Sequence, residues 1–517
     1  MSESPRTLID DLLEEQQRLT AVERFAAKHE RHDLPAQARY YRDLIPLERP
    51  KAGEQYAFAV DLDACTGCKA CVSACHSLNG LDEDELWRTV GTLHGGNRFE
   101  PYQQTITTAC HHCVDPACAE GCPVMAYEKD AETGIVRHLD DQCIGCQYCV
   151  LKCPYDVPKY SKKRGIVRKC DMCHGRLAAG EAPACVQACP NEAIRIEVVV
   201  KNVVIAASGA GARVTPGAFE SSYTRPTTRY STTRRMPENT LPADTAQLRL
   251  DHAHWPLIFM LVLTQAAAGT YAGAATYGWL GSGFALPLAI AATLLLQAGL
   301  AVSVLHLGRP LGAWRFFLGL RTSWMSREIL AFSVFAGAGA AYAGALWMGW
   351  PIASALSIGT VALAAIGVAC SAMIYVDTRR PWWSARATFT RFFGATAALG
   401  FHVIAGITGS PVALAAGVVA LFLYAGGQSS AEARAVHDEE HPWHRSARTA
   451  KLLLGGALEI RMISMLLSTA LAAFAFVGSA RWLAILSGLA AFVTVVAERL
   501  VFFRASAPPR MPGGVPS

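Results

Sequence analysis

The chain has 517 residues, of which 52% are hydrophobic and 17% are charged, and its mean hydropathy is +0.22. These values exclude a disordered chain and argue against a purely soluble one. The formal net charge of +5 is too small to indicate a nucleic-acid-binding protein. Sixteen of the 17 cysteines lie between Cys65 and Cys189, whereas the long apolar stretches follow Trp255. Two kinds of chemistry therefore occupy different halves of one chain.

The first 53 residues are polar and helix-prone, so we expect a helical N-terminal arm at residues 1–53. The arm could pack on its own domain or grip a partner subunit, because an amphipathic stripe alone does not identify what it packs against. Its apolar stripe is formed by Leu8, Leu12, Leu13, Leu19 and Val22. No apolar signal core or twin-arginine pair lies in residues 1–30, so we expect no export signal. In a reducing compartment, dense cysteine predicts metal binding rather than disulfides.

Residues 54–198 carry the cysteines in four groups separated by short strand-like runs. The first and third groups have the spacing C-x2-C-x2-C-x3-C, which is the ferredoxin ligation pattern: three thiolates hold one cluster and the fourth holds its neighbour. Structural zinc also uses C-x2-C pairs but needs no third cysteine in the run. We therefore expect four [4Fe-4S] clusters. The candidate ligands are Cys65, Cys68, Cys71, Cys75, Cys110, Cys113, Cys118, Cys122, Cys143, Cys146, Cys149, Cys153, Cys170, Cys173, Cys185 and Cys189.

Residues 199–250 are rich in Ser, Thr, Pro and Arg, and we expect a polar linker that runs over a surface. Residues 251–503 then contain eight apolar stretches, each close to the length of about 20 residues that spans a bilayer. The fold class we predict is an α+β, double-ferredoxin-like iron-sulfur domain followed by an all-α bundle of eight transmembrane helices. Residues 504–517 form a C-terminal tail.

Arginine and lysine gather in alternate loops of the apolar half. The loops after the second, fourth and sixth stretches each carry several basic residues, such as Arg309 and Arg315, whereas the intervening loops carry almost none. The positive-inside rule assigns the basic loops to the cytoplasm. We therefore expect a multi-pass protein of the inner (cytoplasmic) membrane, with both termini and the iron-sulfur domain on the cytoplasmic side.

The cysteine half, over about residues 54–245, resembles the four-cluster electron-transfer subunit of the dimethyl sulfoxide reductase family of molybdenum enzymes, including YTRPTTRY at 223–230. The apolar half resembles the eight-helix anchor subunit of the same family. The matching segments are HWPLIF at 254–259, LHLGRP at 305–310, TSWMSREI at 322–329 and TRRPWW at 378–383. The two subunits are separate in the best-known relatives and fused here, and residues 1–53 have no counterpart.

The resemblance implies that the cysteine groups pair crosswise, the first with the fourth and the second with the third. The implied ligand sets are Cys65, Cys68, Cys71 with Cys189; Cys170, Cys173, Cys185 with Cys75; Cys110, Cys113, Cys118 with Cys153; and Cys143, Cys146, Cys149 with Cys122. Some relatives replace the third ligand of the second group by Trp and hold a three-iron cluster. Cys118 is present here, which favours four cubanes.

Anchors of this family exchange electrons with quinol, so the resemblance implies a site for menaquinone or ubiquinone as an exchangeable substrate. Quinone chemistry moves protons with electrons, and the site needs titratable groups beside an apolar pocket. His306 ends the second stretch and Glu328 opens the third, and the resemblance implies that both bind quinone. The alternatives are a histidine that meets free helix-end carbonyls and a glutamate that pairs with Arg327 or Arg309. We do not expect haem, because His402 lies mid-span, at a different depth from His306.

The resemblance implies a fused electron-transfer and membrane-anchor subunit that passes electrons between the quinone pool and a molybdopterin-containing catalytic subunit. The expected partners are that catalytic subunit, the lipid bilayer and the quinone pool, but no nucleic acid. The chain shows no substrate pocket of its own, so we interpret it as a non-catalytic subunit of an oxidoreductase complex. The alternatives are a haem-linked formate dehydrogenase or hydrogenase-type respiratory module and a membrane-tethered ferredoxin.

Overall fold

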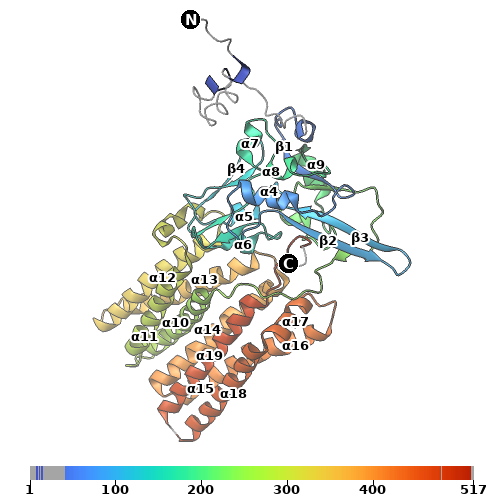
Figure 1. The fold of residues 1–517 in the computed structure, drawn as a ribbon. Helices are drawn as coiled ribbons and strands as arrows, with labels where there is room; N and C mark the ends of the chain where they lie inside the picture. Colours follow the sequence, from blue (N-terminus) through green and yellow to red (C-terminus); the bar gives the residue numbers. More distant parts are fainter. Residues whose placement is uncertain (1–6, 10, 12, 15–40, 479, 514–517) are drawn as a thin grey trace.

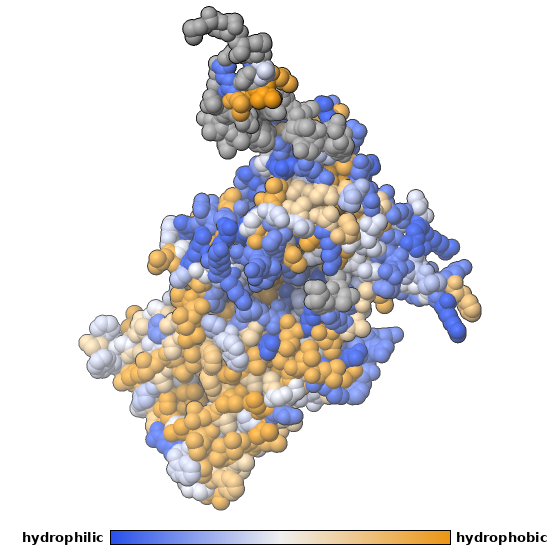
Figure 2. Space-filling view, in the orientation of Figure 1, coloured by the Kyte–Doolittle hydropathy of each residue, from blue (hydrophilic) through white to orange (hydrophobic). Residues whose placement is uncertain are grey.

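A computed structural model describes residues 7–9, 11, 13–14, 41–478 and 480–513. Most of the expected helical arm at 1–53, including Leu12, Leu19 and Val22, lies outside the described residues. The described chain forms two stacked parts, a compact group of short strands and helices and a bundle of long helices (Figure 1). Hydrophilic surface covers the first part and hydrophobic surface covers much of the second (Figure 2). The predicted fold class is confirmed.

The first part consists of short strands and helices. The cysteine loops between them take up much of the chain and leave few residues for longer strands or helices. Its strands are β1 (Glu54–Asp61), β2 (Thr89–Gly96), β3 (Pro101–Thr108), β4 (Tyr127–Lys129), β5 (Val136–His138), β6 (Lys159–Ser161), β7 (Ile166–Arg168), β8 (Ile194–Val200), β9 (Arg229–Ser231) and β10 (Leu241–Pro242). Its helices are α4 (Ala70–Leu78), α5 (Ala117–Glu120), α6 (Tyr148–Lys152), α7 (His174–Ala178), α8 (Ala184–Gln187) and α9 (Lys201–Ala207).

Two small sheets join distant segments of this part. In the first, of order β8-β1-β9, β1 lies antiparallel to β8 and parallel to β9. In the second, of order β10-β2-β3, β2 pairs with both neighbours in antiparallel orientation. Strands β9 and β10 belong to residues 199–250, the segment for which we expected a polar linker. That segment therefore supplies an edge strand to each of these sheets.

Within the residues that the structure describes, eight helices of the second part are long and apolar enough to cross a membrane, as predicted. They are α10 (Trp255–Trp279), α11 (Ala285–Ser303), α12 (Trp324–Trp347), α13 (Ala353–Val376), α14 (Ala385–Thr408), α15 (Pro411–Leu421) continued by α16 (Gly427–His437), α18 (Gly455–Gly478) and α19 (Arg481–Arg504). A π-helical turn at Phe422–Gly426 joins α15 to α16, and the short helix α17 (His444–Leu453) precedes α18.

Backbone hydrogen bonds connect the two parts beside the cysteines. The amide of Arg309, between α11 and α12, donates to the carbonyl of Ile144 at 3.0 Å. The amide of Gly319 donates to the carbonyl of Pro123, also at 3.0 Å. Ile144 follows one candidate ligand and Pro123 follows another, so the membrane bundle holds the backbone of two cysteine loops directly.

Three glycines allow the two parts to approach each other this closely. A Cβ atom on either Gly145 or Gly308 would collide with the carbonyl oxygen of Gly165. A partly buried ion pair lies at the same junction, where the Nζ of the buried Lys152 is 2.6 Å from the Asp377 carboxylate at the end of α13. The absence of side chains therefore permits the glycine contact, and an ion pair stabilises the contact between Lys152 and Asp377.

After α19 the chain returns to the cysteine-rich part. The Arg510 guanidinium lies 2.6 Å from the Asp244 carboxylate, and Met511 is buried in the core of the first part with 4% of its surface exposed. A Cβ atom on Gly91, in β2, would collide with the Pro512 carbonyl. Residues at the far end of the sequence thus complete the packing of the first part.

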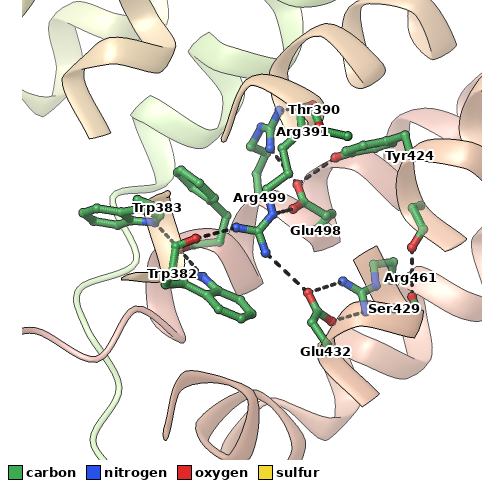
Figure 3. A network of polar contacts seen from close by, with 12 residues as sticks. Trp382, Trp383, Thr390, Arg391, Tyr424, Ser429, Glu432, Arg461, Glu498 and Arg499 are labelled. Atoms are coloured by element: carbon green, nitrogen blue, oxygen red, sulfur yellow. Dashed lines mark hydrogen bonds and ion pairs between the residues drawn. The ribbon is translucent and has the colours of Figure 1, made fainter. Parts of the chain in front are cut away.

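A network of buried charges connects four helices in the second half of the bundle (Figure 3). The Glu498 carboxylate on α19 lies 3.2 Å from the Arg391 Nε on α14 and 2.7 Å from the Arg499 guanidinium. Glu432 on α16 pairs with Arg461 on α18 at 2.6 Å and with Arg391 at 3.6 Å. Since all five side chains are shielded from solvent, each charge depends on its partners.

Replacing Glu498 by glutamine removes the negative charge that Arg391 and Arg499 share. Because it leaves buried positive charge uncompensated, we expect the free energy of unfolding to fall by about 3–5 kcal/mol. Thermal unfolding of the purified protein in detergent measures the change, and Glu440→Gln is the matched control because Glu440 is exposed. Equal unfolding midpoints for the two variants would contradict a stabilising role for the network.

Candidate functional site

Each cysteine group begins with a tight turn of the same kind. In the first C-x2-C segment of each group, the residue directly before the second cysteine has a positive φ. These residues are Gly67 (76°), His112 (40°), Gly145 (71°) and Met172 (60°). The turn directs a backbone amide at the first cysteine of the group, as where Gly145 donates to the Cys143 Sγ at 3.4 Å. Such amide donors stabilise a thiolate.

Cysteines from distant groups meet around common spaces. One cavity is lined by Cys65, Cys68, Cys71 and Cys189, and a second by Cys110, Cys113, Cys118 and Cys153. Elsewhere Cys122 packs with Cys143, Cys146 and Cys149, and Cys75 lies near Cys173 and Cys185. The structure therefore brings together the cysteines of the four crosswise sets that the resemblance implies.

All sixteen cysteines of these groups are free thiols. Burial raises the pKa of the Cys75 thiol to about 12, and the nearby Cys185 contributes to that rise. Burial also raises the pKa of the Cys122 and Cys153 thiols to about 11. Metal binding requires the thiolate form, and bound iron would supply the positive charge that the buried thiolates lack. A donor set made only of cysteine thiols in this spacing, most of them buried, fits iron-sulfur clusters.

A cavity of about 280 Å³ lies where the cysteine-rich part meets the membrane bundle. Cys146 lines it from the cysteine-rich part, and His306 and Glu328 line it from the bundle. The aromatic rings of Trp314 and Tyr375 form part of its wall. The structure thus brings both predicted quinone residues to one apolar cavity that also touches a candidate cluster ligand.

One ring nitrogen of His306 forms a hydrogen bond within the described chain, and the other does not. The Nδ1 atom hydrogen-bonds to the Ser303 carbonyl, and the Nε2 atom is buried with no partner among the described residues. A carbonyl only accepts, so Nδ1 carries the proton and neutral Nε2 is an acceptor. His306 therefore meets a helix-end carbonyl, which was the alternative interpretation, and still retains an unused proton acceptor.

Glu328 forms an ion pair with neither Arg327 nor Arg309. Arg327 donates to the Leu320 carbonyl at 3.2 Å, and Arg309 donates to the Asp140 carbonyl at 2.9 Å. Glu328 itself is only 7% exposed. In the part of the chain that the structure describes, it forms no salt bridge, so the ion-pair interpretation is not supported. A buried carboxyl group without an ion-pair partner at a membrane span indicates a functional site.

His402 lies in a separate place, inside the second half of the bundle. Its Nδ1 contacts the Ala398 carbonyl at 2.7 Å and its Nε2 contacts the Ser468 hydroxyl at 3.3 Å. Both ring nitrogens are thus used within the protein. The structure does not bring His402 to the cavity that His306 lines.

Several residues of the cavity wall are not among those that the motifs of the sequence predict. His254, Trp314 and Tyr375 line it beside the predicted pair. His254 immediately precedes α10 and lies in the HWPLIF segment, so its place at a span boundary was an available signal. Trp314 and Tyr375 gave no such signal, because aromatic residues are common near membrane interfaces.

Two family models match separate parts of the sequence. Residues 102–199 match a 4Fe-4S dicluster domain, and residues 250–423 match the DMSO reductase anchor subunit (DmsC). The first match contains twelve of the sixteen grouped cysteines, and the second contains His306 and Glu328. Each half of the predicted chemistry therefore has its own family match.

Known proteins similar to the cysteine half have names that agree with these matches. The B subunit of the anaerobic dimethyl sulfoxide reductase of Haemophilus influenzae is 39% identical over 153 residues, which cover 27% of this chain and 73% of the relative. YnfG of Escherichia coli K12, a probable anaerobic dimethyl sulfoxide reductase subunit, is 38% identical over 148 residues, covering 27% and 72%. Hydrogenase-2 operon protein HybA of Escherichia coli O157:H7 is 35% identical over 173 residues, with 28% of this chain and 52% of that protein covered.

These relatives and the anchor match agree with the buried thiols and the eight membrane helices. The protein is a multi-pass membrane protein that contains iron-sulfur clusters. It belongs to the family of dimethyl sulfoxide reductase iron-sulfur subunits, joined in one polypeptide to a membrane anchor of the same system, and its role is electron transfer and membrane anchoring.

Proposed function

We propose that this protein transfers electrons between the membrane quinone pool and a molybdopterin-containing catalytic subunit, through four [4Fe-4S] clusters. The observation that carries the proposal is the cavity between the two parts, because Cys146, His306 and Glu328 all line it. A quinol bound there would contact proton acceptors on one side and a cluster ligand on the other. The names of the dimethyl sulfoxide reductase relatives support a reductase as the partner.

Oxidation of a quinol releases two electrons and two protons, so the site needs two proton acceptors. The free Nε2 of His306 would accept one proton, and the Glu328 carboxylate, which has no ion-pair partner among the described residues, would accept the other. The apolar wall, including Trp314 and Tyr375, suits the ring and isoprenoid chain of menaquinone or ubiquinone. The iron-sulfur cluster held by Cys146 supplies one-electron redox chemistry when bound.

The four cysteine sets form a continuous series. Cys146 lines the membrane-side cavity, and Cys118 packs beside its set. Cys110 and Cys170 both lie near Lys169, so the set containing Cys110 is adjacent to the set containing Cys170. Among the sixteen grouped cysteines, Cys68 is the exposed one, so the set that contains it reaches the surface. We propose that electrons enter or leave for the catalytic subunit there.

The proposed domains are the arm at 1–53, the cluster domain at 54–198, the connecting segment at 199–250, the anchor at 251–503 and the tail. The distribution of basic residues supports a cytoplasmic cluster domain at the inner membrane. A quinone site beside that domain would release its protons on the same side.

Replacing Glu328 by glutamine tests the quinone site. The amide cannot accept a proton, so we expect quinol to reduce the clusters about 100-fold more slowly or worse. Rapid mixing of quinol with membrane vesicles, followed by iron-sulfur absorbance, measures the rate. Dithionite should reduce the clusters equally in both proteins, and Glu459→Gln is the matched control because Glu459 is exposed. An unchanged quinol rate in Glu328→Gln would overturn the assignment.

Crosswise ligand sets make a prediction about single cysteine substitutions. Cys110→Ser and Cys153→Ser should abolish the same EPR signal, whereas Cys143→Ser should abolish a different one. The control is Cys370→Ser, since Cys370 lies in α13 outside the four groups. EPR spectra of reduced membranes measure the outcome. If Cys153→Ser removed the signal that Cys143→Ser removes, the proposed sets would be wrong.

The proposed orientation is tested by proteolysis. Lys162, Lys163 and Arg164 are exposed in the turn between β6 and β7. Trypsin should therefore cleave this turn in inverted inner-membrane vesicles and leave it intact in right-side-out vesicles, until detergent opens them. Immunoblotting of the fragments measures cleavage, and the reverse pattern would place the cluster domain outside.

A further inference from the structure

Two buried cations lie between neighbouring cysteine sets. Lys169 is 2% exposed, and its Nζ lies 3.7 Å from the Cys110 Sγ. The same Nζ donates to the Cys170 carbonyl at 2.8 Å and to the Val136 carbonyl. Lys169 forms no salt bridge within the described ranges. Its charge therefore lies at the boundary between the set containing Cys110 and the set containing Cys170.

Arg88 occupies the corresponding place at the next boundary. It is 2% exposed, and its guanidinium covers the Phe58 ring at 4.7 Å. One nitrogen donates to the Thr107 hydroxyl at 3.3 Å, and that hydroxyl lies 3.6 Å from the Cys71 Sγ. The Nε and second terminal nitrogen are buried without partners among the described residues. An uncompensated buried arginine costs several kcal/mol, so nearby negative charge is needed to offset it.

Thiols of two sets surround each cation. Burial lowers the pKa of Arg88, but Cys185, Cys71, Cys170 and Cys75 together raise it above its ordinary value. The Lys169 Nζ, which is 3.7 Å from the Cys110 Sγ, also lies near Cys118, Cys170 and Asp171. Cysteines of two sets are therefore negative partners of each cation, and Asp171 is a further one for Lys169.

The charge of a loaded cluster gives the cations a role. Four thiolates outweigh the positive iron-sulfide core, so an oxidised cluster is already negative, and accepting one electron without a proton makes it more negative. A buried cation favours the reduced form. A cation between two clusters also reduces the repulsion between electrons on both.

We propose that Arg88 and Lys169 are inter-cluster cations, which raise the reduction potentials of the clusters beside them and let neighbouring clusters hold electrons together. This inference rests on the four clusters of the proposed function. The remaining boundary differs, because the buried neutral phenol of Tyr127 lies near both Cys118 and Cys149 there. Lys152, which is adjacent to Cys153, is also buried, but it is paired with Asp377. The structure thus assigns a cation without a carboxylate ion pair to two of three boundaries, away from the membrane-side cluster.

Neutral substitutions test the proposal in membranes containing the full-length protein. In an EPR-monitored redox titration, Arg88→Gln and Lys169→Gln should each lower the reduced-to-oxidised ratio of the two adjacent clusters about tenfold at a fixed ambient potential. For a one-electron couple, that change equals about 59 mV. Arg88→Lys should restore most of the ratio, because it retains the charge. The control is Arg234→Gln, since Arg234 also covers a ring, that of Tyr102, at 4.8 Å but lies on the surface.

The unsubstituted protein separates this inference from the proposed function. Fewer than four clusters by iron content and EPR would contradict the proposed function itself. Four clusters, with unchanged ratios in both glutamine variants, would overturn the role of the cations alone. If Arg88→Gln did not load its clusters, Lys169→Gln would test the second boundary, and an unchanged ratio there would overturn the proposal.

Discussion

The close contact of three glycines at the domain junction is the constraint on which the rest of the arrangement depends. Gly145, Gly165 and Gly308 let the loop after α11 lie directly on the backbone of the cysteine loops. A side chain at Gly308 would collide with Gly165 across the junction, and one at Gly145 would collide with Gly165 and crowd Gly308. The hydrogen bonds at Ile144 and Pro123 would then be lost, and the cavity that Cys146 shares with His306 would open. Electron transfer falls steeply with distance, so this contact determines whether the two halves work together.

Charge is buried in both halves, but it is compensated in different ways. In the bundle, Glu432 and Glu498 pair with arginines at 2.6–3.6 Å, and the network holds four helices together. In the cluster domain, Arg88 and Lys169 face cysteines instead. In the bundle, the carboxylates of the protein itself compensate the buried arginines. In the cluster domain, the buried cations are fully compensated only when metal binding converts the thiols to thiolates. The same physical requirement therefore stabilises structure in one half and adjusts redox chemistry in the other.

Local patterns in the sequence predict much of the molecule. Cysteine spacing defined the four groups of candidate ligands, and apolar length identified the eight spans, because both signals lie within short segments. The positions of His306 and Glu328 at span ends led to one cavity because adjacent loops return to the same membrane face. The edge strand β9 and the cations Arg88 and Lys169 were not predictable in this way. Their roles depend on partners far along the chain, such as β1 for β9 and Cys185 for Arg88.

The return of the C-terminal segment has a consequence for biosynthesis. Met511 lies in the core of the cluster domain, although the ribosome makes that domain first and inserts eight helices before it reaches this residue. Throughout this interval the core lacks one of its side chains, and the edge near Gly91 stays uncovered. The segment around Met511 is therefore the last part of the chain to pack into this core. Before it packs, iron-sulfur carriers would have the freest access to the cysteine loops.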